Sequence, residues 1–297
     1  YMKVIKSITT TDDILTFSNI DEDEYPTWVS GQPYVMSKRV IYNHKIYEAI
    51  VGMTSTTTPD LDQEKWLFID DTNRYRMFNN VVSDKSSRMG GIHFTLRPSQ
   101  IVTGLSLIGV SATFVRVVVT DPVLGVIFDE TKTLMDISSI VSYFDYFYEP
   151  LSSSQTSVAF LNLPTAPTGY IDVYIDSGAN EVEVAEVIYG KYTLVGKTNY
   201  GTAIGIKSFS RKETDEFGNV TVVKRRNSKY CDYDVDIENI RLSAVQKFFS
   251  DIDSVPCLFV GNEELEETIV YGFYSDFKAT ISYPQISKCT LKVEGLV

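Results

Sequence analysis

Few residues in this chain of 297 residues are suited to catalysis or metal binding. It contains two histidines, His44 in a predicted turn and His93 in a predicted strand, so histidine-based triads and histidine-rich metal sites lack donors. We interpret both histidines as structural. The sequence contains no GxSxG elbow, P-loop, dinucleotide-binding glycine turn or HExxH helix. It therefore predicts no catalytic residue, no cofactor and no metal site, and we do not expect an enzyme.

Pairs of carboxylates are the remaining chemical candidates, because a glycosidase needs two acidic side chains a few ångströms apart. Asp215 with Glu216, and Asp232 with Asp234, are such pairs, but a chain with 39 acidic residues contains them by chance. The first pair lies beside Arg211 and Lys212 in a predicted hairpin tip. We interpret that tip as a solvated charged loop.

Aromatic residues offer a different chemistry, sugar stacking, and they gather between Pro26 and Ile69. Strand-sized runs at 39–42 and 45–50 flank the turn pair Asn43-His44, which predicts a compact β-hairpin unit. A module of fewer than about 50 residues buries little aliphatic core, so its large rings serve either as core or as stacking platforms. The stacking candidates are Trp28, Tyr47 and Trp66, and Tyr34 completes the aromatic set.

A second aromatic cluster, SYFDYFYEP, runs from Ser142 to Pro150. Tyr143, Tyr146 and Tyr148 form a possible saccharide groove, whereas core or interface packing is the favoured interpretation.

Composition points to an all-β protein. The chain has 19 Tyr and 16 Phe together with runs of Val, Ile and Thr, which pack well on pleated sheets. The formal net charge of −12 disfavours nucleic acid and anionic membranes as partners. The three cysteines are widely spaced and odd in number, and we expect them to be small buried hydrophobes. They are Cys231, Cys257 and Cys289.

No apolar run resembles a signal peptide or reaches the roughly 20 residues that span a bilayer. We therefore expect that the protein is made in the cytoplasm and does not insert into a membrane.

Four parts are predicted along the chain. Residues 1–25 form an N-terminal arm with a short helical possibility at 12–17, and 26–76 form the small β-module. Residues 77–195 contain strand-sized runs separated by Gly, Pro, Asp and Ser, which predicts a jelly-roll-like β-sandwich. Residues 196–297 form a β-rich domain with a long hairpin at 204–226. One amphipathic helix is predicted near 240–252, from Leu242, Val245, Phe249 and Ile252 at helical spacing.

Several stretches together resemble tail proteins of tailed bacteriophages. They are TWVSGQPYV, IYEA, WLFIDDTNRYRMFNN, the Asn199-Tyr200-Gly201 stretch, FSRKETDEFGN, VYGFYSDF and VEGL. The TNRYRMF and SRKETDEFGN stretches are the more specific ones. In that family a module resembling a chitin-binding, carbohydrate-binding domain precedes sandwich domains. Chitin-binding modules usually carry adjacent aromatics after the Tyr-x-Ala stretch, whereas here Tyr47-Glu48-Ala49 is followed by Ile50 and Val51.

The resemblance implies a virion structural protein of the tail, sheath or tip that assembles as a homo-oligomer and contacts neighbouring tail proteins. Host attachment is the alternative, with the small module binding a host receptor or surface glycan. Because the expected stacking residues after Ala49 are missing, docking is favoured over sugar binding.

Overall fold

The fold was analysed on a computed structural model, which describes residues 1–134, 155–214 and 220–296. Most of the described chain is strand, with several antiparallel sheets and a single α-helix, so the predicted all-β class is confirmed. The Ser142–Pro150 cluster with Tyr143, Tyr146 and Tyr148, and the Asp215 and Glu216 pair, lie outside the described residues.

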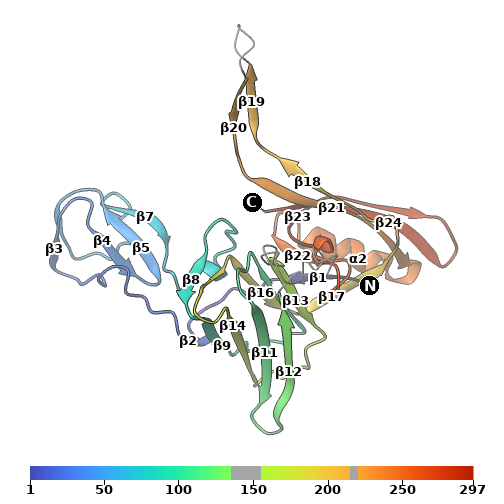
Figure 1. Cartoon of the computed structure of the whole chain (residues 1–297), viewed down its shortest axis with the longest axis horizontal. Helices are drawn as coiled ribbons and strands as arrows, with labels where there is room; N and C mark the ends of the chain where they lie inside the picture. The colour runs from blue at the N-terminus through green and yellow to red at the C-terminus, as the bar shows by residue number, and fades with distance from the viewer. Residues whose placement is uncertain (135–154, 215–219, 297) are drawn as a thin grey trace, which may run out of the picture.

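The small module stands apart from the rest of the chain in Figure 1 and has its own core. Its three-stranded sheet has the order β4-β5-β7, and a two-stranded sheet pairs β3 with β6. The strands are β3 (Gln32–Tyr34), β4 (Arg39–Tyr42), β5 (Lys45–Ala49), β6 (Met53–Ser55) and β7 (Trp66–Asp71). The module core is mainly aromatic, as expected for so short a segment.

The middle of the chain forms the predicted β-sandwich. A five-stranded sheet with the order β12-β11-β14-β9-β2 faces a three-stranded sheet with the order β13-β10-β16, and one apolar cluster joins them. The first sheet comprises β2 (Leu15–Ser18), β9 (Ile92–Leu96), β11 (Phe114–Asp121), β12 (Gly125–Thr133) and β14 (Tyr170–Asp176). The second comprises β10 (Gly104–Ile108), β13 (Ser157–Leu161) and β16 (Glu186–Gly190), and β8 (Ser86–Met89) pairs with β15 (Glu181–Val184) beside it. Burial alternates along β9 and β14, as expected when one sheet face meets the core and the other meets water.

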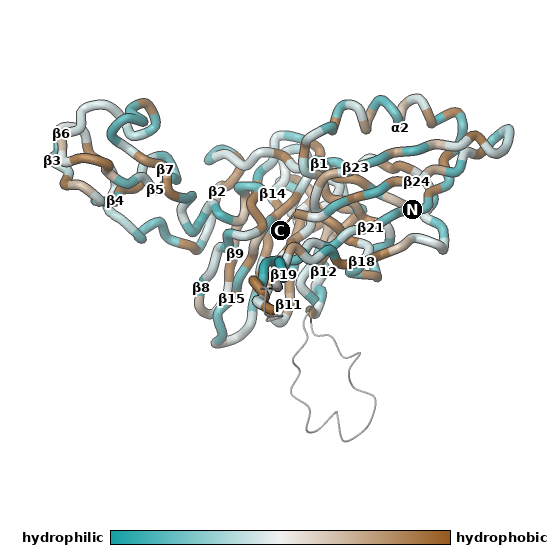
Figure 2. Tube along the Cα trace, turned by 90° about the horizontal axis from the view of Figure 1, so that it is seen from above, coloured by the Kyte–Doolittle hydropathy of each residue, from teal (hydrophilic) through white to brown (hydrophobic). Residues whose placement is uncertain are grey.

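The C-terminal part is a seven-stranded sheet with the order β17-β1-β22-β23-β24-β21-β18. Its strands are β1 (Met2–Lys6), β17 (Tyr192–Thr198), β18 (Ala203–Ser208), β21 (Asn227–Glu238), β22 (Cys257–Val260), β23 (Ile269–Ile281) and β24 (Ile286–Gly295). The predicted helix is α2 (Asn239–Asp251), which runs along one side of this sheet in Figure 2, and its buried Val245 and Phe249 pack against the sheet. Short 3-10 turns are η1 (Arg76–Phe78) and η2 (Glu266–Thr268). All three cysteines are free and buried in this part, as expected.

The N-terminal segment is not a separate arm, and this corrects the sequence-based expectation. Residues 2–6 form β1, which is hydrogen-bonded between β17 and β22, and Met2, Val4 and Ile5 are fully buried. Residues 15–18 form β2 at the edge of the sandwich, so the proposed helix at 12–17 is also wrong. Sheet pairing overrode local propensity here, because the alternative leaves several apolar side chains in water.

A long two-stranded ribbon leaves the edge of the seven-stranded sheet and stands out from the body in Figure 1. It begins with β18 paired to β21 and continues as β19 (Arg211–Thr214) paired to β20 (Val220–Val223). This matches the hairpin predicted at 204–226.

A buried acid, Glu186, lies where the sandwich meets the C-terminal sheet. Its side chain is 1% exposed, the backbone N–H of Asn80 is its hydrogen-bond donor, and its Oε2 has no partner within the described ranges. Tyr271 of β23 is close to this carboxyl and donates its hydroxyl hydrogen to the Asn80 side chain at 2.7 Å. Burial raises the pKa of Glu186 to about 9, so the carboxyl group stays protonated at neutral pH.

We expect Glu186→Gln to stabilise the protein at pH 8 by about 1–3 kcal/mol and to have a smaller effect at pH 5. The unfolded chain releases this proton near pH 4.5, whereas the folded protein keeps it up to about pH 9. The free energy of unfolding therefore falls as the pH rises between these values. Glutamine has no such proton to lose. Urea unfolding of both proteins at the two pH values measures the difference, and a gain independent of pH would contradict this explanation.

Candidate functional site

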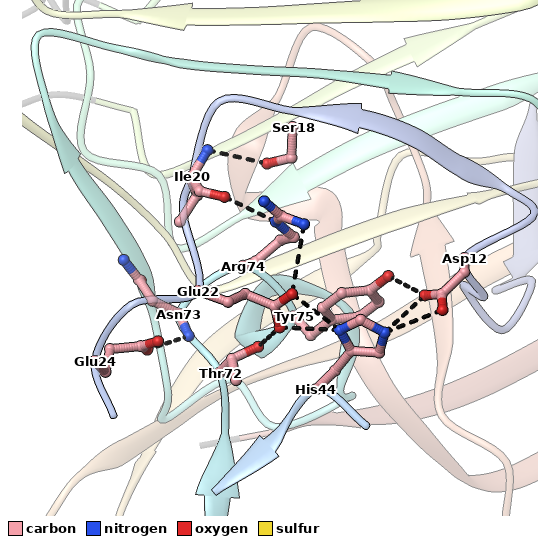
Figure 3. Close-up of polar contacts among 10 residues, drawn as sticks. All are labelled: Asp12, Ser18, Ile20, Glu22, Glu24, His44, Thr72, Asn73, Arg74 and Tyr75. Carbon is pink, nitrogen blue, oxygen red and sulfur yellow. Dashed lines mark hydrogen bonds and ion pairs between the residues drawn. The ribbon is translucent and has the colours of Figure 1, made fainter. Parts of the chain in front are cut away.

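A charged junction joins the small module to the sandwich, and it is built from three segments distant in the sequence. The first is the acidic segment 12–24, the second is the β4-β5 turn, and the third is the stretch 72–75 after β7 (Figure 3). Side chains from all three converge on His44.

The β4-β5 turn presents His44 to the junction. Asn43 and His44 have φ values of 51° and 62°, so both central residues are left-handed, as in the two-residue hairpin turns that match strand twist. This conformation is uncommon in residues other than glycine, but asparagine and histidine adopt it more often than most. The surrounding contacts hold His44 in it: its backbone C=O accepts a hydrogen bond from Thr72 at 2.9 Å, and its ring meets two carboxylates.

Both nitrogens of the His44 ring have an acidic partner. Nδ1 lies 2.9 Å and 3.0 Å from the two carboxylate oxygens of Glu22, and Nε2 lies 2.9 Å from Asp12. Burial alone opposes a charge on this ring, but the two carboxylates outweigh it and raise the pKa of His44 above 6.5. With each N–H donated to a carboxylate, the ring has no free nitrogen to accept a proton from a substrate. The arrangement holds a charge rather than acting as a general base.

Tyr75 covers His44 and binds the same acid. The two rings stack with their centroids 4.1 Å apart, and the Tyr75 hydroxyl donates to Asp12. The hydrogen bonds from Tyr75 and His44 lower the pKa of Asp12. Burial and the bond to Asp12 raise the pKa of Tyr75, so its hydroxyl stays protonated and remains a donor.

Glu22 is better buried than Asp12, with 15% of its side chain exposed against 66% for Asp12. Besides His44, it accepts the Thr72 hydroxyl hydrogen at 2.5 Å and lies 3.4 Å from the Arg74 guanidinium. Arg74 also donates to the backbone C=O of Ile20 at 2.7 Å, which fixes the acidic segment from the opposite side.

Asn73 connects this junction to the sandwich. Its backbone N–H donates to Glu24 at 2.6 Å, and its side chain exchanges two hydrogen bonds of 2.8 Å with the backbone of Ser87 in β8. The module is thus tied to the sandwich through polar and charged contacts.

A cleft of about 430 Å³ opens beside His44. Its walls carry hydroxyl, amide and carboxylate groups from 9–12, 43–45 and 71–79. Asp71 lies in this wall, and burial raises its pKa.

The three predicted stacking residues lie in one cluster, but two of them are buried. Trp66 is 1% exposed and Tyr47 is 7% exposed, whereas Trp28 is half-buried. Trp28 and Trp66 both donate their indole N–H to the Ser55 hydroxyl at 3.3 Å. A sugar needs an open ring face, so the stacking assignment does not fit Tyr47 and Trp66 in this structure. These rings form the module core together with Val40 and Ala49.

His93 belongs to a ladder of side chains across the outer face of the five-stranded sheet. Its ring stacks on Tyr174 at 4.1 Å and tilts toward Phe17 at 5.0 Å, while Arg116 lies over Tyr174 at 5.9 Å. Because His93 and Arg116 both pack on the Tyr174 ring, they reduce the ring surface that is open to a sugar.

Asp232 and Asp234, the second carboxylate pair, lie on the face of β21 turned away from α2, and both are half-buried. Across the described part of the chain, no group of three or more His, Cys, Asp or Glu side chains is arranged to hold a metal ion. Nor do the described ranges include a helix with the length and apolar character needed to cross a bilayer.

Sequence reasoning identified His44 as structural but missed its acidic partners. The run 21–24 was expected to belong to a separate arm, whereas in the fold it meets Arg74 near the end of the module. The opposite charges of these two short segments, at the beginning and the end of the module, were the usable signal.

We expect NMR titration to give His44 a pKa above 6.5, and Asp12→Asn to lower it. A folded pKa above the unfolded value means that His44 contributes its full stabilisation below pH 6.5 and loses it as the pH rises through the folded pKa. The pKa of Asp12 is shifted in the opposite direction, downward, so its contribution to stability is lost as the pH falls below 3.8. The junction is therefore strongest between about pH 4 and 6.5. The His93 resonance is an internal control, and a His44 pKa below 6.5 would contradict the assignment.

Glu22→Gln should destabilise the protein more than Asp12→Asn, by roughly 2 kcal/mol against less than about 1 kcal/mol. The reason is burial, because water screens the exposed Asp12 and does little to replace the contacts of Glu22. Chemical unfolding at pH 6 measures both changes. Equal costs for the two variants would show that the burial difference does not govern the junction.

No protein-family model matches this sequence, and no curated protein matches it at a significant level.

Proposed function

We propose that this chain is a structural subunit of a bacteriophage virion tail, which assembles with copies of itself and with neighbouring tail proteins. One observation carries the proposal, namely the order of parts. After β1 and β2, which belong to the C-terminal sheet and the sandwich, a small aromatic module with a separate core precedes the remaining strands of the sandwich and then those of the C-terminal sheet. This is the order that the resemblance to tail proteins implies.

The two most specific stretches of that resemblance have structural positions consistent with an assembling part. TNRYRMF supplies Thr72, Asn73, Arg74 and Tyr75 to the junction, and SRKETDEFGN contributes to the protruding ribbon. One stretch fixes a domain to its neighbour, and the other extends surface away from the body. Both roles position one part of a structure relative to another.

Attachment to a host receptor or glycan is the competing proposal for the small module. Sugar binding requires exposed rings, and only Trp28 among the three candidates keeps part of its surface open. The module does expose apolar side chains of another kind, including Val35 at 70% and Leu61 at 76%. Such side chains suit contact with protein better than stacking on sugar, so we favour docking.

The direct test is the composition of purified phage particles. We expect mass spectrometry to find the protein in intact virions in several copies, and a map of the particle to place it in the tail. A protein absent from particles and strictly monomeric by mass photometry would defeat the proposal.

Retention on chitin or on host cell-wall polysaccharide tests the competing proposal. Trp28→Ala is the informative variant, because it removes the one candidate ring with open surface. Retention that Trp28→Ala abolishes would favour attachment, and no retention on any envelope fraction leaves docking.

A further inference from the structure

The ribbon carries an open strand edge. β18 pairs with β21 alone and β19 pairs with β20 alone, so the outer edge of 203–214 has no strand beside it among the described residues. Unpaired edges of this length offer backbone N–H and C=O groups to another chain.

The same ribbon exposes apolar side chains. Ile204 is 50% exposed, Ile206 68%, Val220 59% and Val222 55%. Ile204 and Ile206 lie on one face of the ribbon base and line a shallow cleft of about 280 Å³ with Lys229 and Glu267. An apolar patch of this kind on a protruding element marks an interaction site.

The ribbon is basic in an otherwise acidic protein. Residues 203–229 hold seven of the 27 basic residues and three of the 39 acidic ones, so this segment carries +4 while the remaining chain carries −16. Lys224, Arg225 and Arg226 are exposed, and no acidic side chain of the described residues lies within ion-pair distance of them. The surface that such a segment attracts is an acidic one.

We propose that the ribbon docks on an acidic surface of a second copy of this chain. Two ribbons brought together would place their basic residues against each other, and these like charges repel. The contact therefore joins the ribbon of one copy to a different surface of the next. Contacts of this heterologous kind generate rings or helical stacks. The inference rests on the proposed tail function. It adds which element makes the contact, and that the contact joins two unlike surfaces.

The test compares the wild-type chain with a ribbon variant, Lys224→Glu, Arg225→Glu and Arg226→Glu. The matched control changes three exposed lysines elsewhere, Lys191→Glu, Lys278→Glu and Lys288→Glu, with the same change in net charge. We expect wild type and control to assemble at about 0.05 M NaCl and to dissociate toward 0.5 M. The ribbon variant should lose at least about tenfold in self-affinity by mass photometry. Circular dichroism spectra of the three proteins should superimpose.

Mixing a labelled ribbon variant with wild type shows whether the contact joins the ribbon to a different surface or joins two ribbons to each other. Its own acidic surface is intact, so it should still accept the wild-type ribbon and end the growing assembly. A variant that stays monomeric and also fails to bind wild type would overturn the heterologous contact in favour of ribbon-to-ribbon pairing.

Two further results would overturn the proposal while leaving the proposed function standing. One is a ribbon variant that assembles like wild type, and the other is a wild type that stays monomeric in solution but is present in virions. Double-stranded DNA is the other negatively charged partner to which a basic ribbon could bind. If wild type binds DNA, the ribbon variant loses that binding, and self-assembly is unchanged, the ribbon is a nucleic-acid contact instead.

Discussion

The insertion of β1 into the C-terminal sheet is the constraint on which the body of the molecule depends. Ile5 lies among side chains of both large domains, and a Cβ at Gly104 would come within 2.6 Å of its Cδ1. Gly190 is equally close to the backbone, where a Cβ would lie 2.7 Å from the carbonyl oxygen of Lys6. A strand from the very start of the sequence is thus packed where only glycines leave room. Because the same strand is hydrogen-bonded to β17 and β22, the sandwich and the C-terminal sheet share one buried seam.

The small module is held by a different physical force. Its core is separate from that of the sandwich, and the junction is built from charge pairs and hydrogen bonds among Glu22, His44 and Arg74. Burying charge is favourable only where each group is paired, and the junction meets that condition by giving both His44 nitrogens a carboxylate. The position of the module therefore depends on the protonation of a histidine and an aspartate.

Local patterns in the sequence predicted much of the fold. The hairpin at 204–226 and the helix near 240–252 were predicted from turn residues and from helical spacing, because such local patterns record where the chain turns and which face is buried. The position of β1 was not predictable in this way, since its pairing partners lie almost 200 and more than 250 residues away. The junction was hidden for the same reason, as Asp12 and Tyr75 meet only through the fold. The rings of Tyr47 and Trp66 were recognised, but their burial follows from three-dimensional packing that composition does not encode.

The basic residues of the ribbon resolve a difficulty that its open edge creates. An exposed strand with apolar neighbours invites pairing with any similar strand, and the nearest similar strand is the ribbon of another copy. Lys212 on that edge and Lys224, Arg225 and Arg226 in the same ribbon make such pairing unfavourable through repulsion of like charge. The same charges leave the approach to acidic surfaces attractive, and the rest of this chain is strongly acidic. One set of side chains therefore both discourages disordered edge pairing and selects an ordered contact, which is what a repeating assembly of identical subunits requires.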